Sequence, residues 1–183
     1  GKFIIPQEDL PQFYELYYDH IYNKCKNEYL TEKQFGYALA VDFDFRYKSD
    51  VSTRHHTEHH IDDMVCDYLN VLKTCYVMDK DTSFEIFVFE KPNINKKNPE
   101  VTKDGIHMLI GLQVDFTMQC IIREKMINIL PNTWDDLPLI NNWESVLDEG
   151  ISKGHTNWQL YGSKKPGGES YELTQHYSIT IDP

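Results

Sequence analysis

Two acidic residues separated by one position occur in the hydrophobic run Val41-Asp42-Phe43-Asp44-Phe45. On a β-strand, residues two apart face the same side, so Asp42 and Asp44 point together while their neighbours face the core. Adjacent carboxylates repel each other, and a divalent cation relieves that repulsion. Hard oxygen ligands suit Mg²⁺ or Mn²⁺. The alternative is a half-exposed strand whose polar face is acidic for no functional reason.

A single histidine lies in the apolar run Gly105–Ile110. An imidazole at His107 could bind a phosphate, ligate a metal or act as a base. Gly105, two positions earlier, permits a ligand to approach the backbone closely. Taken alone, a core histidine with a backbone partner is the simpler interpretation.

Two further segments could complete such a site. Asp148 ends a short apolar run and could add a third carboxylate, although a turn residue before Gly150 explains it equally. The following turn brings together backbone amides, the hydroxyl of Ser163 and the ammonium groups of Lys164 and Lys165, which could hold a triphosphate. The turn lacks the spacing of a P-loop, and an exposed hairpin turn favours the same residue types.

The histidine-rich stretch Arg54–His60 invites a zinc interpretation. It contains no H-E-x-x-H pattern, and no nearby cysteine completes a tetrahedral ligand set. We therefore expect no zinc, and interpret the stretch as a polar loop that enters a helix, with Arg54 available to contact a phosphate.

Hydrophobic periodicity predicts the elements that position these residues. The predicted helices are Glu8–Tyr29, a segment after the N-cap Thr57, and Phe116–Leu130, capped by Asp115 and ended by Pro131. The predicted strands are Tyr37–Phe45, Ser83–Phe89, Ile106–Gln113, the short runs Glu144–Asp148 and Trp158–Tyr161, and one or two strands within Tyr171–Ile181. Loops are expected at Arg46–His56 and Glu90–Asp104, with irregular structure at Trp134–Asn142. Helices and strands mix without strict βαβ alternation, which predicts an α+β fold.

The composition limits the function classes. The chain has 183 residues, typical of one domain, and a net charge of -11, which argues against a protein that coats nucleic acid electrostatically. It does not exclude an enzyme that acts on nucleic acid, because a metal site is itself acidic. The sequence contains no long uncharged apolar run and no secretory signal, so we expect no membrane association. Four scattered cysteines fit a reducing, intracellular compartment.

The order of these motifs resembles that of the archaeo-eukaryotic primases. The likeness is strongest to the primase domain that precedes the helicase in D5-type primase-helicases of nucleocytoplasmic large DNA viruses. It rests on ALAVDFDFR, KDGIHMLIG, SVLDEG and WQLYGSKKPGGESYEL, which together run from Ala38 to Leu173. The resemblance implies a catalytic core with a central mixed sheet, an RRM-like half and flanking helices. It also implies one domain over residues 1–183, excised from a longer protein with a fused C-terminal superfamily 3 helicase.

The resemblance implies a template-directed nucleotidyltransferase that synthesises short primers on single-stranded DNA from NTPs or dNTPs. Asp42, Asp44 and Asp148 would hold two Mg²⁺ or Mn²⁺ ions. The implied nucleotide-binding residues are Gly105, His107, Ser163, Lys164 and Lys165, and the expected DNA contacts are Arg46 and Arg54. Relatives often carry serine where this chain has Gly105, so one hydroxyl contact is lost here.

Two other functions compete with this interpretation. An HUH-type replication-initiator endonuclease needs two histidines flanking a hydrophobic residue, whereas His107 is followed by Met108 and Leu109. A non-catalytic replisome docking domain could keep the fold without the chemistry. If the protein is viral, the expected location is the host cytoplasm or a viral replication factory.

Overall fold

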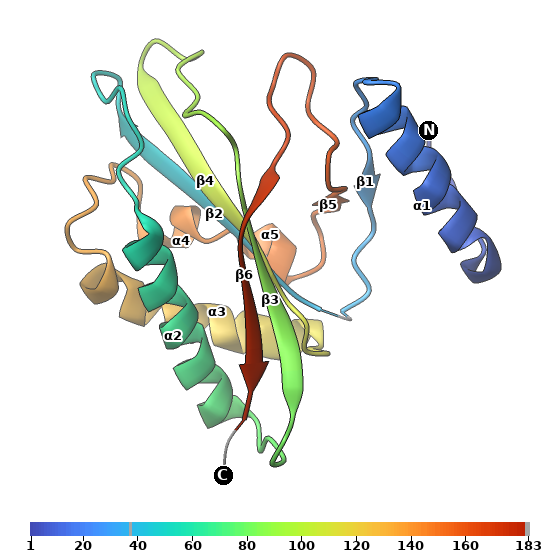
Figure 1. The fold of residues 1–183 in the computed structure, drawn as a ribbon. Coiled ribbons are helices and arrows are strands. Elements are labelled where there is room, and N and C mark those ends of the chain that lie inside the picture. The colour runs from blue at the N-terminus through green and yellow to red at the C-terminus, as the bar shows by residue number, and fades with distance from the viewer. Residues whose placement is uncertain (37, 182–183) are drawn as a thin grey trace.

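The computed structural model describes residues 1–36 and 38–181 and has the predicted α+β architecture (Figure 1). A four-stranded sheet has the order β2-β4-β3-β6 and packs one face against helices α2 and α3. The strands are β2 (Leu39–Lys48), β3 (Ser83–Glu90), β4 (Val101–Ile110) and β6 (Glu172–Thr180). The two helices are α2 (Glu58–Cys75) and α3 (Phe116–Thr133). Tyr37, where the first strand was predicted to begin, lies outside the described residues.

All neighbouring strands in this sheet are antiparallel, so the expected mixed sheet is wrong in that detail. The reason is the insertion of β4 between β2 and β3, which are parallel to each other but not adjacent. The β2–α2–β3–β4–α3 run is therefore a split β-α-β arrangement, in agreement with the expected RRM-like half. This insertion places β4, with its histidine, directly beside the acidic strand.

Successive side chains of β2 alternate between the buried core face of the sheet and the opposite face, which carries Asp42 and Asp44. Phe43, Phe45 and Tyr47 are fully buried on one face, and both phenylalanine rings pack against Trp134. The residues between them point to the opposite face, as expected for a pleated strand. Burying several aromatic side chains at ~1.5–3 kcal/mol each fixes the register, because a one-residue slip would turn the carboxylates into the core.

The N-terminal segment forms a separate layer beside the other face of the sheet (Figure 1). A 3-10 turn (Gln7–Asp9), helix α1 (Leu10–Tyr18) and a π-helical turn (Asp19–Asn23) follow one another. The predicted helix to Tyr29 is too long, because Cys25 adopts a positive φ of 51° that ends helical geometry. Strand β1 (Thr31–Glu32) then pairs with β5 (Trp158–Gln159).

Two predicted loops are shorter than expected. Strand β2 continues to Lys48 and β4 begins at Val101, because the two strands pair over their full length and bury Thr102. Residues 46–48 and 101–104 were both predicted as loop. Their alternating polar side chains face solvent on one side, which masks the strand pattern in the sequence.

The last third differs most from the prediction. Helix α3 continues past Pro131 to Thr133, since a proline in the last turn removes only one backbone donor and the buried Leu130 and Trp134 hold the turn in place. The predicted strand over 144–148 is wrong. Helix α4 (Trp143–Val146) occupies most of this stretch, Leu147 forms an isolated bridge to Phe43, and α5 (Glu149–Ser152) follows Asp148. No helix within the described residues is long and apolar enough to cross a bilayer.

Candidate active site

Asp42 and His107 lie opposite each other on neighbouring strands. The register of β2 and β4 pairs Asp42 with His107 and Asp44 with Gly105. The Nε2 atom of His107 is 3.3 Å from Oδ1 of Asp42. That oxygen is buried and accepts no hydrogen bond from the described residues. Two motifs 65 positions apart in the chain therefore meet, as the sequence predicts for a shared site.

Asp148 joins the same edge of the sheet. Its backbone N–H donates to the carbonyl of Asp42 at 3.0 Å, and Phe43 bridges to Leu147. The side-chain Oδ1 of Asp148 accepts from the N–H of Gly150 at 2.6 Å and caps α5. Asp148 therefore precedes a turn, as one interpretation of the sequence predicted, and its backbone also lies beside β2.

The pKa of Asp44 is raised. Burial is the main cause, followed by the negative charges of Asp42 and Asp148, while His107 and Arg46 oppose the shift. We call Asp42, Asp44 and Asp148 the carboxylate site. Its negative charge is incompletely compensated by the protein itself.

The donor set fits a hard divalent cation that binds together with a substrate. Within the described residues, no group of three or more His, Cys, Asp or Glu side chains is arranged to hold a metal ion, so a cation here would need ligands from its substrate. Mg²⁺ commonly takes one or two carboxylates and completes its shell with substrate phosphates and water. The unpartnered buried oxygen of Asp42 and the adjacent carboxylate of Asp44 fit that pattern.

Aromatic rings fix the orientation of His107, which is 8% exposed. Tyr171 stacks on the imidazole with ring centroids 3.6 Å apart, and Trp158 packs at 4.6 Å. Burial and then the charges of Asp42 and Asp44 raise the pKa of Tyr171, which keeps the phenol neutral. Sequence reasoning missed Tyr171 as a site residue, because only the return of the chain along β6 brings it to β4.

Lys91 is a second site residue that the sequence did not reveal. Its ammonium lies 4.7 Å from the ring centroid of Tyr171. Burial and the nearby charge of Lys165 lower the pKa of Lys91, whereas Asp42 and Asp44 oppose that shift. Lys91 and Lys165 thus place two cations near the carboxylate site. The available signal was weak, because Lys91 directly follows β3 but lies within the predicted loop Glu90–Asp104.

Gly105 serves the strand pairing. A Cβ atom at this position would lie 2.5 Å from the carbonyl oxygen of Phe43. No side chain fits there without moving the backbone of β2. The close approach that the glycine permits is therefore an approach of the neighbouring strand.

The basic turn after β5 contains a buried serine with a structural role and an exposed lysine. Ser163 is fully buried, and its hydroxyl donates to the carbonyl of Leu30 and accepts from the N–H of Leu30. The backbone N–H of Lys164 donates to the carbonyl of Glu28. Ser163 therefore holds the turn against the N-terminal segment, and Lys165 is exposed beside it.

The two arginines that were expected to contact DNA differ in position. Arg46 is exposed on the same face as Asp44. Arg54 lies away from that face, where it donates to Asp104 at 2.8 and 2.9 Å and to the carbonyl of Lys91 at 2.7 Å. The structure therefore brings Arg46, and not Arg54, to the carboxylate site.

Arg54 belongs to a buried cluster on the core side of the sheet. His56 Nε2 lies 2.6 Å from Oε1 of Glu90, and Arg54 contacts both Glu90 and Asp104. We call Arg54, His56, Glu90 and Asp104 the core-face network. The histidine-rich stretch is thus a loop that enters α2, as predicted, and His56 anchors it.

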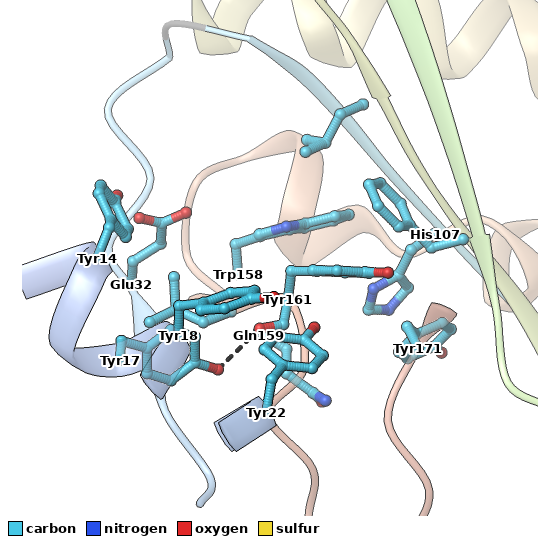
Figure 2. Close-up of a pocket in the computed structure, with 13 residues that line it drawn as sticks. Tyr14, Tyr17, Tyr18, Tyr22, Glu32, His107, Trp158, Gln159, Tyr161 and Tyr171 are labelled. Carbon is cyan, nitrogen blue, oxygen red and sulfur yellow. Dashed lines mark hydrogen bonds between the residues drawn. The ribbon is translucent and has the colours of Figure 1, made fainter. Parts of the chain in front are cut away.

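A pocket of about 340 Å³ adjoins His107 on the side away from β2 (Figure 2). Figure 2 shows tyrosines of the N-terminal helical segment at one side, His107 and Tyr171 at the other, and Trp158 and Tyr161 between them in this view. The hydroxyl of Tyr17 donates to the carbonyl of Tyr161 at 2.8 Å. The lining residues are Tyr14, Tyr17, Tyr18, Tyr22, Glu32, Phe89, His107, Leu109, Trp158, Gln159, Leu160, Tyr161 and Tyr171.

Comparisons with known proteins agree with this geometry. The family described as "C962R protein N-terminal AEP domain", where AEP denotes archaeo-eukaryotic primase, matches residues 1–177. The chain belongs to this family. It is also 32% identical over 186 aligned residues to "Putative helicase L207/L206" of Acanthamoeba polyphaga mimivirus. That alignment covers 99% of this chain and 19% of the mimivirus protein. Family and relative together support a primase-like role in replication.

Proposed function

We propose that this domain is a template-directed nucleotidyltransferase that synthesises short primers on single-stranded DNA. The observation that carries the proposal is the carboxylate site opposite His107, where a buried oxygen of Asp42 lacks a hydrogen-bond partner among the described residues. Such a site has an excess of negative charge, which a divalent cation and its bound triphosphate would balance.

Asp42 and Asp44 would hold the Mg²⁺ or Mn²⁺, with Asp148 beside them. When bound, the cations supply charge neutralisation and lower the pKa of the attacking hydroxyl. In the reaction, the terminal hydroxyl oxygen of the primer forms a bond to the α-phosphorus of the nucleotide. The bond from that phosphorus to its bridging oxygen breaks, pyrophosphate leaves, and the hydroxyl proton passes to water.

Positively charged and hydrogen-bonding groups of this chain would orient the triphosphate. His107 is held by Tyr171 and Trp158, so its imidazole needs little reorganisation to contact a phosphate. Lys91 and Lys165 lie close enough to influence each other electrostatically, which fits two cations that share one polyanionic ligand.

We infer that the domain works within a larger replication protein. The mimivirus relative is named a helicase, and this chain spans only 19% of its length. The net charge of -11 favours weak intrinsic affinity for DNA. A fused helicase would provide most of the binding affinity for the template strand.

Primer synthesis on single-stranded DNA tests the proposal directly. Wild type is incubated with labelled NTPs or dNTPs and Mg²⁺ or Mn²⁺, beside the variant Asp42→Ala/Asp44→Ala. Short products that vanish in the variant support the polymerase. Products that persist in the variant contradict the assigned metal ligands.

The same proteins separate the two competing functions. Stabilisation of the native state by nucleoside triphosphate with metal raises the melting temperature in proportion to affinity. A docking domain would show no such rise, and an HUH enzyme would respond to metal without nucleotide. The described geometry offers no support for an HUH pair, since the residue that follows His107 on the same face is Leu109.

A further inference from the structure

The pocket beside His107 has walls suited to a flat, uncharged ring. Aromatic side chains dominate its lining, and four of them are the tyrosines Tyr14, Tyr17, Tyr18 and Tyr22. Among the described residues that line it, none is lysine or arginine, and Glu32 is the single carboxylate. A phosphate group would find no positive partner there. A nucleobase has the π-faces that stack on such rings.

The pocket is continuous with the carboxylate site but does not overlap it. His107 borders both, because its Nε2 points toward Asp42 while its ring lines the pocket. The remaining sheet residues of the pocket, Phe89 and Leu109, lie on β3 and β4. A ligand in the pocket therefore sits over the centre of the sheet, whereas the reacting phosphates would sit over β2.

We propose that this aromatic pocket binds an unpaired nucleobase of single-stranded DNA. The assignment of the strand as DNA rests on the proposed function. The base of an incoming nucleotide must pair with a template base, so its hydrogen-bonding edge cannot turn into a protein wall. A base outside that pair is free to do so, and its N–H groups can donate to Glu32, the carboxylate among the described residues that line the pocket.

The mouth of the pocket has rings that are ready to stack. Tyr14 is 46% exposed and Tyr18 is 57% exposed. Glu32, on β1, is exposed at the pocket, so its carboxyl is accessible to a ligand.

Binding of an abasic oligonucleotide isolates the contribution of the base. Fluorescence anisotropy compares a labelled oligothymidylate with an abasic strand of equal length, without metal or nucleotide. We expect wild type to bind the base-containing strand about tenfold more tightly, in line with stacking of one base on aromatic side chains. Tyr14→Ala/Tyr18→Ala should abolish that difference, and Tyr14→Phe/Tyr18→Phe should keep it.

Two controls separate this proposal from the proposed catalysis. Tyr29→Ala removes a tyrosine of similar exposure, 47%, outside the pocket and should bind like wild type. Asp42→Asn/Asp44→Asn removes the carboxylate pair and should keep the preference for bases. Equal affinity of wild type for the two strands, no measurable binding, or a preference that survives Tyr14→Ala/Tyr18→Ala would each overturn the base pocket. None of these results depends on whether primers are made.

Discussion

The two charged clusters at one end of the sheet differ in how completely their charges are compensated. The core-face network pairs two buried carboxylates with an arginine and a histidine at distances of 2.6 to 3.6 Å. Among the described residues, the carboxylate site on the opposite face has one ion pair, between Asp42 and His107, and the backbone N–H of Gly150 donates to Asp148. The core-face network pairs both of its carboxylates with positively charged or imidazole groups, although Nδ1 of the buried His56 has no hydrogen-bond partner among the described residues. The carboxylate site leaves a negative charge that an added cation would balance, which is why we propose it as the functional site.

The largest expected effect comes from removing the uncompensated carboxylates. Asp42→Ala/Asp44→Ala should lower primer synthesis by at least roughly a thousandfold, or about 4 kcal/mol in activation free energy. Its free energy of unfolding should not fall, because the substitution relieves repulsion. Synthesis assays and chemical denaturation check both. The matched control Asp50→Ala/Asp63→Ala removes two exposed carboxylates elsewhere and should keep activity.

The opposite outcome is expected on the core face. Arg54→Ala leaves Asp104 buried without its partner and should lower the free energy of unfolding by about 2 kcal/mol, a reduced value because Arg54 is 26% exposed. Arg46→Ala, on the other face, should change stability by less than ~0.5 kcal/mol. Urea denaturation compares the two. If the Arg54→Ala protein were as stable as wild type but bound DNA more weakly, Arg54 would contact DNA, as the sequence predicts.

A smaller effect is expected from the cation near the carboxylates. Lys91→Met keeps a chain of similar length against Tyr171 but removes the charge. We expect about tenfold weaker nucleotide binding, or ~1.4 kcal/mol, because one charge-assisted phosphate contact is lost. Calorimetric titration with nucleotide and Mg²⁺ measures it. The control is Lys73→Met, at an exposed position on α2. Equal nucleotide affinities of the two variants would show that Lys91 does not contact the nucleotide.

The smallest expected effect is a change in how the free energy of unfolding depends on pH. Burial favours the neutral form of Glu90, but hydrogen bonds from His56 and Thr174, with the charge of Arg54, outweigh burial and lower its pKa. The folded state therefore gains stability from ionised Glu90 above the ordinary carboxyl range and loses it as pH falls through the lowered pKa.

Glu90→Gln should accordingly reduce the free energy of unfolding by about 1 kcal/mol at neutral pH. The gap between the variant and wild type should narrow in acid, where wild type loses its own contribution. Denaturation curves at several pH values give this comparison. A gap that widens in acid would show that the charge of Glu90 is not stabilising.

Local patterns predicted the half of the site that depends on strand periodicity. Asp42, Asp44 and His107 follow from alternation within hydrophobic runs, and the core on the other face fixes that alternation. Lys91 and Tyr171 could not be predicted in this way. Their approach to His107 depends on the length of the β3–β4 hairpin and on β6 returning beside β3. Neither property is encoded in a short window of sequence.

At some positions the residue type was correctly recognised as structurally important, but the structure gives a different physical reason for it than the sequence suggested. Gly105 indicated close approach, and the group that approaches is the carbonyl of Phe43. Ser163 suggested a phosphate contact, whereas both of its hydrogen bonds join Leu30. Pro131 suggested a helix end at Leu130, three residues before the observed end at Thr133, because packing of the neighbouring core residues outweighs one lost backbone bond.

Through two hydrogen bonds to the backbone of Leu30, the hydroxyl of Ser163 connects two segments that are far apart in the chain. With the bond from Tyr17 to Tyr161, they join the N-terminal tyrosines to the turn that carries Lys165. These bonds favour movement of the two segments together. A DNA strand bound at the proposed base pocket would therefore also shift the turn proposed to hold the nucleotide.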